Sequence, residues 1–517
     1  MNERGEHLQP VAFVRSGARE RPVAEVITRS MRVAAGLSRM GLKPGDRYAI
    51  VMRNEIAYFE ANFGAGSAGL SPVPVNWHWT GEDLRHLLHD SDAKVAIVHT
   101  DLLPAVEMHR PAQMQIIEAE VPDEIIAPYG LGPVPLTGRY RTLDQLIEDN
   151  EPLTDETPAP PLGVIYTSGT TGTPKGIQRA PMTEEQLANT RARQQSLYKF
   201  APGASTICPA PLYHTAPNVF AMFALGMGLD ITVMPRFDPE DFLRIVQDHQ
   251  VLTVQMVPTM FQRLLKLPAP VRASYDVSSL EVVVHSAAPC PIHVKEAMIE
   301  WFGPIIAEYY GGSEGGSWTF VTSEESLAKP GTVGRAKPPA TVKILAGDGR
   351  WTGPGEVGVI YGLNPEVMPD FTYIGDVAKR RSIEVDGLIT VGDMGYLDED
   401  GYLFLSDRAN DMVISGGVNI YPAEIESVLH EMPQIEDAAV FGIPDEEYGE
   451  RLAAHIQPVA GSHVNENEVR SYLMERLAKY KVPRVIVFEE QLPREDSGKL
   501  FKRRIREKYM NHERSAS

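Results

Sequence analysis

One stretch decides the fold: YTSGTTGTPKG, which runs from Tyr166 to Gly176. It follows an apolar run, Gly163 to Tyr166, that predicts a strand. Its three glycines let backbone N–H groups approach an oxyanion, while five Ser or Thr hydroxyls and Lys175 supply further donors. We therefore expect a phosphate-binding loop. It is not a Walker A loop, because Pro174 precedes the lysine and the Gly-Lys-Ser/Thr ending is absent, which disfavours ordinary kinase and GTPase machinery.

Around this loop, strand-like and helix-like segments alternate as far as about residue 320. The clearest strands have the apolar continuity of buried parallel strands: Tyr48 to Met52, Lys94 to Val98, Gly163 to Tyr166, Ile231 to Met234, Val251 to Gln255 and Glu281 to His285. Between them, Val33, Leu37 and Met40 recur at helical spacing before Gly41. This alternation predicts a layered α/β fold. From Gly331 to Leu405, short strands broken by Gly-Asp and Asp-Gly turns predict a small antiparallel or barrel-like β subdomain.

A second domain is expected to begin after Arg408. Its predicted elements are a helix from Pro422 to His430, strands from Asp437 to Ile443 and from Ala453 to Gln457, a helix from Glu466 to Lys479 and a strand from Arg484 to Phe488. A unit of ~110 residues lies within the size range of an independent domain. We therefore expect a large N-terminal α/β domain, residues 1–408, and a small α+β domain, residues 409–517.

Composition limits the class of function. The 517 residues carry 49 Lys or Arg against 69 Asp or Glu, and the net charge of −20 argues against a nucleic-acid partner. The stretch from Arg494 to Arg514 is locally basic, which fits a solvated tail and a contact with an anionic cofactor equally well. Cys208 and Cys290 are too few for a disulfide framework. Because neither a signal peptide nor a transmembrane segment is evident, we expect a cytoplasmic protein.

The glycine-rich loop resembles the phosphate-loop signature of the adenylate-forming superfamily, which comprises acyl-CoA synthetases, nonribosomal-peptide adenylation domains and firefly-type luciferases. Further segments resemble that family's motifs in the same order: YGGSE (310–314), TVGD (390–393), Asp407-Arg408 with SGGVNIYP (415–422), and LPREDSGK (492–499). The resemblance spans nearly the whole chain and is nearest to the stand-alone acyl-CoA ligases. It implies a large N-terminal domain and a small C-terminal domain that is mobile.

The resemblance also implies which residues bind ATP. Adenylation joins a carboxylate to the α-phosphate of ATP, so two anions must be brought together and the charge on pyrophosphate neutralised. By resemblance, Glu314 holds Mg²⁺, Tyr310 stacks on adenine and Asp393 binds the ribose hydroxyls. The implied ATP or AMP contacts are Thr167, Ser168, Gly169, Thr170, Thr171, Gly172, Lys175, Ala288, Tyr310, Gly311, Ser313, Asp393 and Arg408. The implied catalytic residues are Lys499, Glu314, Lys175 and His214.

Formation of the thioester involves the C-terminal domain by the same resemblance. Family members rotate this domain between the two half-reactions, and the hinge falls here on Asn410, where the family usually has Asp or Lys. Rotation withdraws Lys499 and presents the loop around Gly417 to a tunnel for the pantetheine of coenzyme A. Tyr448 and Tyr480 are weaker candidates for contact with the CoA nucleotide, and ordinary packing is the alternative for each.

The acyl site is the part of the protein that the sequence defines least. PLYH (211–214) resembles the family segment whose aromatic or His side chain gates that site, and HSAAP (285–289) resembles a stretch that is often Gly-Gly. The expected acyl contacts are His214, Ala216, Asn218, Ala287, Gly312 and Gly315. Such small residues favour a hydrophobic, bulky acid, either long-chain or polycyclic. No cationic residue is evident among them, which disfavours amino acids and dicarboxylates.

These motifs predict an ATP-dependent carboxylic acid–CoA ligase that uses ATP, Mg²⁺ and coenzyme A. Four residues depart from common family choices, namely Ser313, Ser286, Ala287 and Asn410, so an enzyme that catalyses only one half-reaction is an alternative. It would form a thioester from a preformed acyl-adenylate, or would adenylate an acid and load an acyl carrier protein. A catalytically inactive binding protein is a further alternative. The oligomeric state is also open, with a homodimer as one option.

Overall fold

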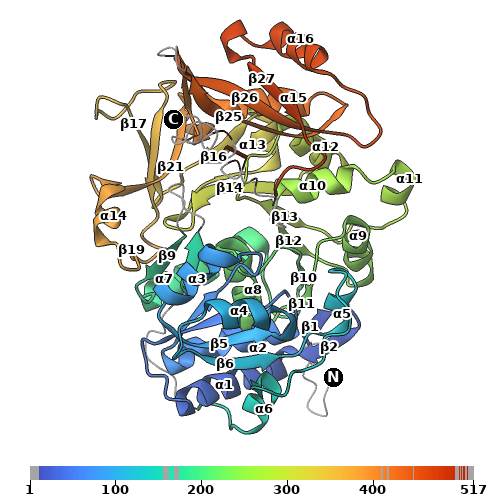
Figure 1. Cartoon of the computed structure of the whole chain (residues 1–517), viewed down its shortest axis with the longest axis vertical. Coiled ribbons are helices and arrows are strands. Elements are labelled where there is room, and N and C mark those ends of the chain that lie inside the picture. The colour runs from blue at the N-terminus through green and yellow to red at the C-terminus, as the bar shows by residue number, and fades with distance from the viewer. Residues whose placement is uncertain are drawn as a thin grey trace.

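The structure is a computed structural model, and it describes residues 11–154, 162–167, 174–408, 411–415, 418–445, 448–494, 500, 502, 505, 506 and 509. Within these ranges the strands form four sheets. One of them, formed by strands after residue 412, belongs to the C-terminal domain, which lies at one end of the molecule (Figure 1). No helix of the described ranges is long and apolar enough to cross a membrane.

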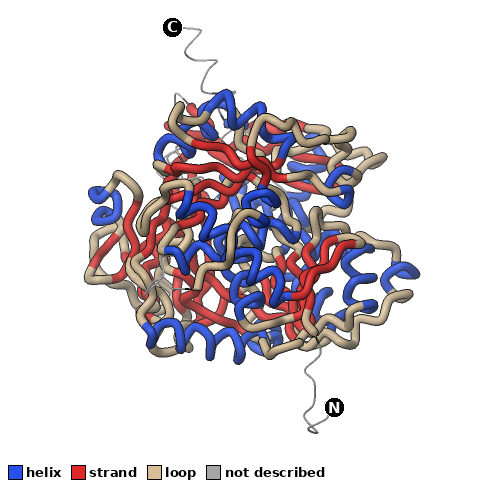
Figure 2. Tube along the Cα trace, turned by 90° about the horizontal axis from the view of Figure 1, so that it is seen from below, coloured by secondary structure: helices blue, strands red, loops and turns tan. Residues whose placement is uncertain are grey.

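The N-terminal part is built on a parallel five-stranded sheet. Its strands, in spatial order, are β4 (Ser71–Pro74), β3 (Arg47–Val51), β5 (Ala93–His99), β6 (Gln115–Ala119) and β7 (Arg141–Thr142). The helices of this part are α1 (Val23–Arg39), α2 (Ile56–Phe63), α3 (Gly81–Asp90), α4 (Leu103–His109), α5 (Asp123–Ile126) and α6 (Leu143–Glu148). Strands and helices alternate along this part of the chain, which is the expected layered α/β arrangement, and Figure 2 shows helices lying against strands.

The largest sheet has 14 strands within the described ranges. Its parallel part contains β13 (Val282–His285), β12 (Thr253–Met256), β10 (Ser205–Cys208), β11 (Asp230–Val233) and β1 (Phe13–Ser16), with β14 (Ile306–Gly312) parallel to β13 and β2 (Arg19–Pro22) antiparallel at the edge. From β14 onward the pairing is antiparallel, through β15 (Gly316–Val321), β16 (Thr332–Arg335), β22 (Tyr402–Arg408), β21 (Leu388–Leu397), β18 (Gly358–Leu363) and β17 (Thr341–Leu345), with β20 (Glu384–Val385) beside β21. The predicted antiparallel subdomain is therefore present, but it continues the large sheet.

Eight helices lie between residues 184 and 382, within the part of the chain that the structure describes. They are α7 (Glu184–Tyr198), α8 (Thr215–Gly226), α9 (Pro239–Asp248), α10 (Pro258–Leu265), α11 (Ala269–Arg272), α12 (Ile292–Phe302), α13 (Ser323–Ala328) and α14 (Val377–Ser382). The main apolar core joins the two large sheets, because side chains of α1, α2 and β3 pack in one cluster with side chains of α8 and β11. Helix α1 contributes Val26, Val33 and Leu37, which recur on one face as the sequence pattern predicts.

A small third sheet holds the ends of the glycine-rich loop. It consists of β8 (Ile165–Thr167), β9 (Lys175–Arg179) and β19 (Phe371–Tyr373), in the order β19-β9-β8. The expectation of a parallel strand before the loop is wrong, since β8 pairs antiparallel with β9 and Thr167 lies opposite Lys175. The physical reason is that the loop joins two neighbouring strands, and only antiparallel neighbours can be joined by so short a connection.

The C-terminal domain is an α+β unit, as predicted. Its strands are β24 (Val418–Ile420), β23 (Val413–Ser415), β26 (Gly449–Pro458), β25 (Ile435–Asp445) and β27 (Val485–Phe488), and its helices are α15 (Pro422–His430) and α16 (Glu466–Arg476) with the 3₁₀ turn η3 (Lys479–Lys481). Ile425 and Leu429 of α15 and Val469 and Leu473 of α16 pack on the sheet in a separate apolar core. An ion pair of 2.8 Å between Lys266 and Glu436 Oε1 connects this domain to the end of α10.

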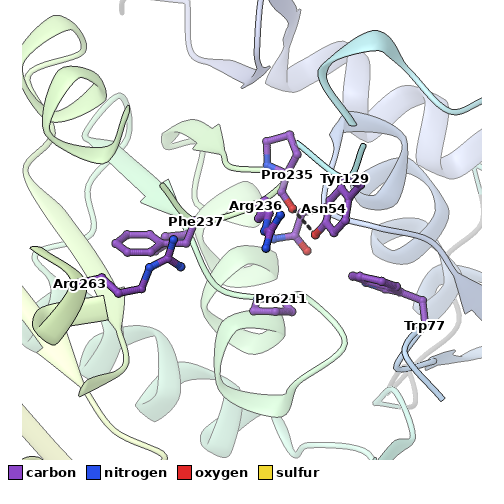
Figure 3. Close-up of a pocket in the computed structure, with 9 residues that line it drawn as sticks. Asn54, Trp77, Tyr129, Pro211, Pro235, Arg236, Phe237 and Arg263 are labelled. Carbon is purple, nitrogen blue, oxygen red and sulfur yellow. Dashed lines mark hydrogen bonds between the residues drawn. The ribbon is translucent and has the colours of Figure 1, made fainter. Parts of the chain in front are cut away.

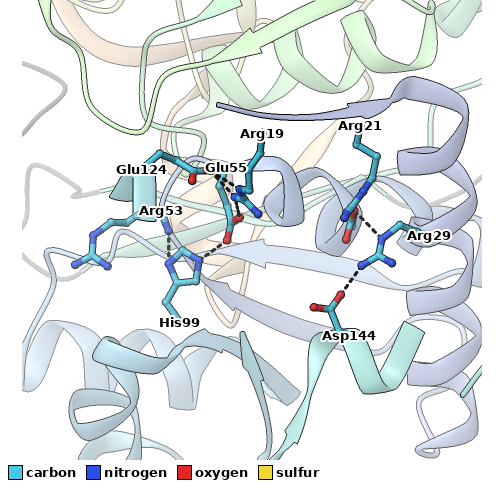
Figure 4. A network of polar contacts seen from close by, with 9 residues as sticks. Arg19, Arg21, Arg29, Arg53, Glu55, His99, Glu124 and Asp144 are labelled. Carbon is cyan, nitrogen blue, oxygen red and sulfur yellow. Dashed lines mark hydrogen bonds and ion pairs between the residues drawn. The ribbon is translucent and has the colours of Figure 1, made fainter. Parts of the chain in front are cut away.

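A buried ion network fixes the β1–β2 hairpin onto the N-terminal sheet (Figure 4). The carboxylate of Glu55 accepts from Arg19 at 2.7 Å and lies 2.7 Å from Nε2 of His99, and its side chain is 2% exposed. Burial by itself raises the pKa of Glu55, but the hydrogen bond with His99 and the charge of Arg19 outweigh burial, so the pKa lies below its ordinary value. The charges of this network are thus paired, and we assign the network to stability.

Candidate active site

The expected adenine and ribose residues meet at the end of β14. Tyr310 is buried, and its hydroxyl donates to Oδ2 of Asp393 at 2.9 Å. Asp393 on β21 lies opposite Arg408 on β22 in the strand register, so the backbone brings the expected ribose residues together. These three residues are separated by up to about a hundred positions in the sequence. They lie at the carboxyl end of a strand of an open α/β sheet, where ligands of this architecture bind.

A chain of three side chains links the glycine-rich loop to the expected metal ligand. Oε1 of Glu314 accepts from the hydroxyl of Tyr373 at 3.0 Å, and Nζ of Lys175 lies 5.8 Å from the centre of the Tyr373 ring. Burial and the neighbouring charge of Glu314 raise the pKa of Tyr373, so the hydroxyl stays protonated and donates. Lys175 also lies 4.0 Å from Oδ2 of Asp376. The structure thus brings Lys175 and Glu314 to one place through a tyrosine that the motifs did not include.

Arg179 holds the backbone beneath Glu314. Its guanidinium donates to the carbonyl oxygens of Ser313 and, at 3.0 Å, of Glu314. Burial lowers the pKa of Arg179 to about 10, although the charges of Glu314 and Asp370 oppose that shift. A signal for this residue exists in the sequence, because positions 175, 177 and 179 share one face of β9. Arg179 therefore stands on the same side of the strand as Lys175.

The segment that carries His214 contacts the YGGSE turn directly. His214 precedes the first residue of α8, and the hydroxyl of Thr215 lies 2.7 Å from that of Ser313. Ala216 follows on the same helix turn, whereas the Asn218 amide donates to Tyr58 and to the Leu212 carbonyl at 2.7 Å. Asn218 thus holds the segment to the core of the N-terminal part.

At Gly312 of YGGSE and at Gly315, the residue after it, neighbouring side chains occupy the space that a side chain would take. A side chain at Gly312 would lie 2.5 Å from Val391, and one at Gly315 would lie 2.4 Å from the Trp318 indole nitrogen. At these two positions the missing side chain accommodates a neighbour, so it leaves less room for a ligand than the sequence indicates. Ala287 and Ala288 follow β13, and Ala287 is exposed in the left-handed region at φ +73°.

Several expected residues lie outside the described ranges, or are described for the backbone alone. They are Ser168, Gly169, Thr170, Thr171 and Gly172 of the glycine-rich loop, Asn410, Gly417 and Lys499, together with the side chain of Arg408. The flanks of the lysine segment are described. Arg494 and Leu500 form an antiparallel bridge, and Arg494 Nη2 pairs with Asp437 Oδ1 at 2.6 Å. Burial alone would raise the pKa of Asp437, but Arg494 and His430 lower it to about 2.

The two tyrosines expected near the CoA nucleotide differ in their surroundings. Arg484 stacks 4.4 Å from the ring centre of Tyr448, while Tyr480 in η3 is 54% exposed. Ordinary core packing therefore does not account for Tyr480. Neither contact tests a role in CoA binding, which stays a prediction.

A basic, aromatic pocket is lined in part by Pro211, which begins the segment that ends at His214 (Figure 3). It is lined by Asn54, Trp77, Tyr129, Pro209, Pro211, Pro235, Arg236, Phe237 and Arg263. Arg236 lies 5.7 Å from the Tyr129 ring centre and Arg263 lies 5.0 Å from that of Phe237. Guanidinium groups on aromatic walls suit a ligand with phosphates and a planar base. Sequence reasoning missed this pocket because its residues come from distant parts of the chain.

The metal chemistry of the site depends on one carboxylate. Among the described residues, no three His, Cys, Asp or Glu side chains are placed to enclose a metal ion. Glu314 presents a hard oxygen ligand beside the glycine-rich loop, and Mg²⁺ in nucleotide enzymes is commonly held by one or two carboxylates plus substrate phosphates. The residues present therefore fit Mg²⁺ that arrives with ATP.

Comparisons with known proteins cover most of the chain. The model of the AMP-binding enzyme family matches residues 6–371, and that of the AMP-binding enzyme C-terminal domain matches residues 424–499. A feruloyl-CoA synthase of Amycolatopsis is 32% identical over 504 residues, which cover 96% of this chain and 95% of the relative. A fatty acid–[acyl-carrier-protein] ligase of Streptomyces coeruleorubidus is 31% identical over 490 residues, covering 93% and 90%.

Solved structures give the same picture. The o-succinylbenzoate CoA synthetase of Bacillus subtilis, in complex with its acyl-adenylate intermediate, superposes with a TM-score of 0.80 at 26% identity, covering 96% of each chain. The ATP-bound MatB of Rhodopseudomonas palustris superposes with a TM-score of 0.80 at 25% identity, covering 98% of this chain and 97% of that one. The large N-terminal and small C-terminal domains match these adenylate-forming enzymes.

Proposed function

This chain belongs to the AMP-binding enzyme family, whose members among its relatives include acid–CoA ligases, and from that premise we propose that it is an ATP-dependent carboxylic acid–CoA ligase. It activates the acid as an acyl-adenylate, releasing pyrophosphate, and then transfers the acyl group to the thiol of CoA, releasing AMP. The observation that carries the proposal is the link from Lys175 through Tyr373 to Glu314, next to the Tyr310–Asp393 pair.

Each half of the nucleotide has residues of suitable chemistry. Tyr310 offers a ring face to adenine, and Asp393 accepts from the ribose hydroxyls while Tyr310 orients its carboxylate. Lys175 and the backbone N–H groups of the glycine-rich loop bind the phosphates. Glu314 holds Mg²⁺, which neutralises charge on the phosphate oxygens when bound. Lys499 donates to the approaching carboxylate and α-phosphate during adenylation.

The acid and CoA are assigned to different parts of the protein. The acid lies at His214, Ala216 and Ala287, next to Ser313 through the Thr215 contact. For CoA we assign the phosphorylated nucleotide to the pocket of Arg236 and Arg263. Gly417, Tyr448 and Tyr480 then serve the pantetheine and nucleotide after the C-terminal domain turns about Asn410.

A carrier protein is the second candidate acceptor, because one relative at 31% identity is a ligase for an acyl carrier protein. The test incubates the purified chain with ATP, Mg²⁺ and a panel of carboxylic acids, adding CoA or a phosphopantetheinylated carrier protein. We expect pyrophosphate release with the acid alone and acyl-CoA by mass when CoA is present. Acyl transfer to the carrier but not to CoA would show that the carrier protein, and not CoA, is the acceptor. No acid-dependent pyrophosphate with any acid would refute adenylation.

A further inference from the structure

Helix α3 packs against the β8–β9 hairpin, whose two strands hold the ends of the glycine-rich loop. Its apolar residues Leu84, Leu87 and Leu88 recur at helical spacing and are buried. They belong to one apolar cluster with Val164, which precedes β8, and with Tyr166 of β8. The helix also packs against β9, the strand that follows the loop (Figure 1). This packing fixes the side of α3 that faces the hairpin.

Two polar side chains of α3, one helical turn apart, bind the hairpin on either side of the loop. Nε2 of His86 lies 3.0 Å from the carbonyl oxygen of Pro174, and because a carbonyl only accepts, His86 donates. Oδ2 of Asp90 accepts from the hydroxyl of Tyr166 at 2.7 Å. Burial and the contact with Asp90 raise the pKa of Tyr166, so this hydroxyl stays protonated and donates. Residues four apart share one face of a helix, so both contacts come from the same side of α3.

A third contact joins the end of α3 to β9. Arg47 of β3 donates to the carbonyl of Ser91, the residue after α3, at 2.9 Å. The same guanidinium donates to Oε1 of Gln178 on β9 at 3.0 Å. Helix α3 is therefore held to both strands of the hairpin, and the contact at Pro174 lies directly before Lys175 in the chain.

The side chain of Lys175 projects from the face of β9 that α3 does not cover. A side chain at Gly176 would lie 2.7 Å from the ring of Tyr166, so that face is covered by the tyrosine that α3 holds. Neighbouring residues of a strand point to opposite faces, and Lys175 accordingly lies beside Tyr373 and Asp376. Helix α3 thus supports the strand on one side, while Lys175 faces the expected phosphate site on the other.

The carbonyl of Pro174 is the group through which the backbone can be held at this point. Proline has no N–H to donate, and a buried carbonyl such as that of Pro174 needs a partner. The peptide bond is planar, so the carbonyl of Pro174 and the nitrogen of Lys175 belong to one rigid unit. The hydrogen bond from His86 therefore fixes the backbone from which the side chain of Lys175 projects.

We propose that His86 is a positioning residue for the adenylation half-reaction, because its hydrogen bond to Pro174 holds Lys175 where the phosphates of ATP bind. The inference rests on the proposed acid–CoA ligase function. ATP presents three phosphates to Lys175, whereas the acyl-adenylate keeps only the one that is joined to the acid. Loss of the His86 contact therefore weakens the step that consumes ATP and leaves thioester formation almost unchanged.

The experiment compares ATP with AMP. Dissociation constants for both nucleotides are measured by calorimetry on the full-length protein with Mg²⁺, and KM for ATP is measured from acid-dependent pyrophosphate release. In His86→Leu we expect both values for ATP to rise about threefold to tenfold, the scale of one lost hydrogen bond. AMP affinity, and the conversion of a supplied acyl-adenylate and CoA to acyl-CoA, should stay within about twofold, since neither involves the phosphates that leave as pyrophosphate.

Two amide variants and a control make the result specific. His86→Gln places an amide nitrogen near the position of Nε2 and should keep ATP affinity close to the wild-type value. His86→Asn is equally polar but too short to reach Pro174, so it should show the loss. This pair decides the question even if the leucine variant folds poorly. His89→Leu changes an exposed histidine of the same helix and should leave ATP affinity unchanged.

The failures of the two proposals look different. An unchanged KM for ATP in His86→Leu, an equal loss of AMP affinity, or an equal loss in His89→Leu would overturn the role of His86 while leaving the ligase. A lower kcat in both half-reactions at unchanged KM would also overturn it, because a variant that only folds less well loses active molecules. Wild-type protein that releases no pyrophosphate with any acid would refute the ligase and, with it, the inference.

Discussion

Removing the Tyr373 hydroxyl tests the link between the glycine-rich loop and Glu314. The hydroxyl donates to Oε1 of Glu314 at 3.0 Å, and its pKa is raised by burial, so the bond is present throughout the working pH range. A hydrogen bond to a charged group contributes about 1.5–3 kcal/mol. Loss of a partner that orients a metal ligand typically lowers metal affinity or activity by about 10- to 100-fold, which is the same range expressed as a ratio. We expect Tyr373→Phe to lower kcat/KM by that factor.

The assay follows acid-dependent pyrophosphate release at fixed ATP while Mg²⁺ is varied. Because the phenylalanine keeps the ring beneath Lys175, the loss should be largest at low Mg²⁺ and partly recovered at high Mg²⁺. Tyr402→Phe is a matched control, since the Tyr402 hydroxyl donates to Glu325 at 3.1 Å away from the site. A Tyr373→Phe enzyme within twofold of wild type at low Mg²⁺, or an equal loss in Tyr402→Phe, would refute the reasoning.

Two other predictions concern the lysine segment and the basic pocket. Asp437→Asn should destabilise the C-terminal domain by about 2 kcal/mol at neutral pH, because the fall of the carboxyl pKa from 3.8 to about 2 is worth 1.36 kcal/mol per unit. Since that pKa is depressed in the folded protein, the difference from wild type should be present above pH 4 and shrink as pH falls toward 2. Hydrogen exchange in β25 should be roughly 30-fold faster at pH 7, whereas Glu436→Gln on the same strand should change it little, and equal acceleration in both would contradict the prediction. Arg236→Ala should raise KM for CoA about threefold to tenfold, as expected for one charge-assisted phosphate contact. Pyrophosphate release measured without CoA should be unchanged. A loss of pyrophosphate release instead would contradict the assignment of this pocket to CoA.

Much of the fold follows from local patterns. The apolar runs near Tyr48, Lys94 and Ile231 are strands of parallel sheets, because their continuity requires burial on both faces. The helix from Pro422 begins and ends as predicted, since Pro at the first helical position and the apolar spacing agree. The run before the glycine-rich loop was misjudged, because its apolar content does not reveal that β9 returns beside it.

The candidate site was predictable only where a motif carried it. Tyr310, Asp393 and Glu314 stand in short motifs, and the structure places them together with Lys175. Tyr373 has no such motif. Tyr373 reaches Glu314 because β19 pairs with β9. Pairing between distant strands and helices is set by the global fold, so single-sequence patterns do not contain it.

The most direct test of the central claim separates the two half-reactions with Lys499→Ala. The account predicts that wild-type protein releases pyrophosphate with ATP and acid and forms acyl-CoA when CoA is added. The variant should lose pyrophosphate release by on the order of 10²–10³, the effect of removing one preorganised donor. It should still convert a supplied acyl-adenylate and CoA to acyl-CoA at close to the wild-type rate. Unchanged pyrophosphate release in the variant, or wild-type protein that makes acyl-CoA only from a supplied adenylate, would contradict the account.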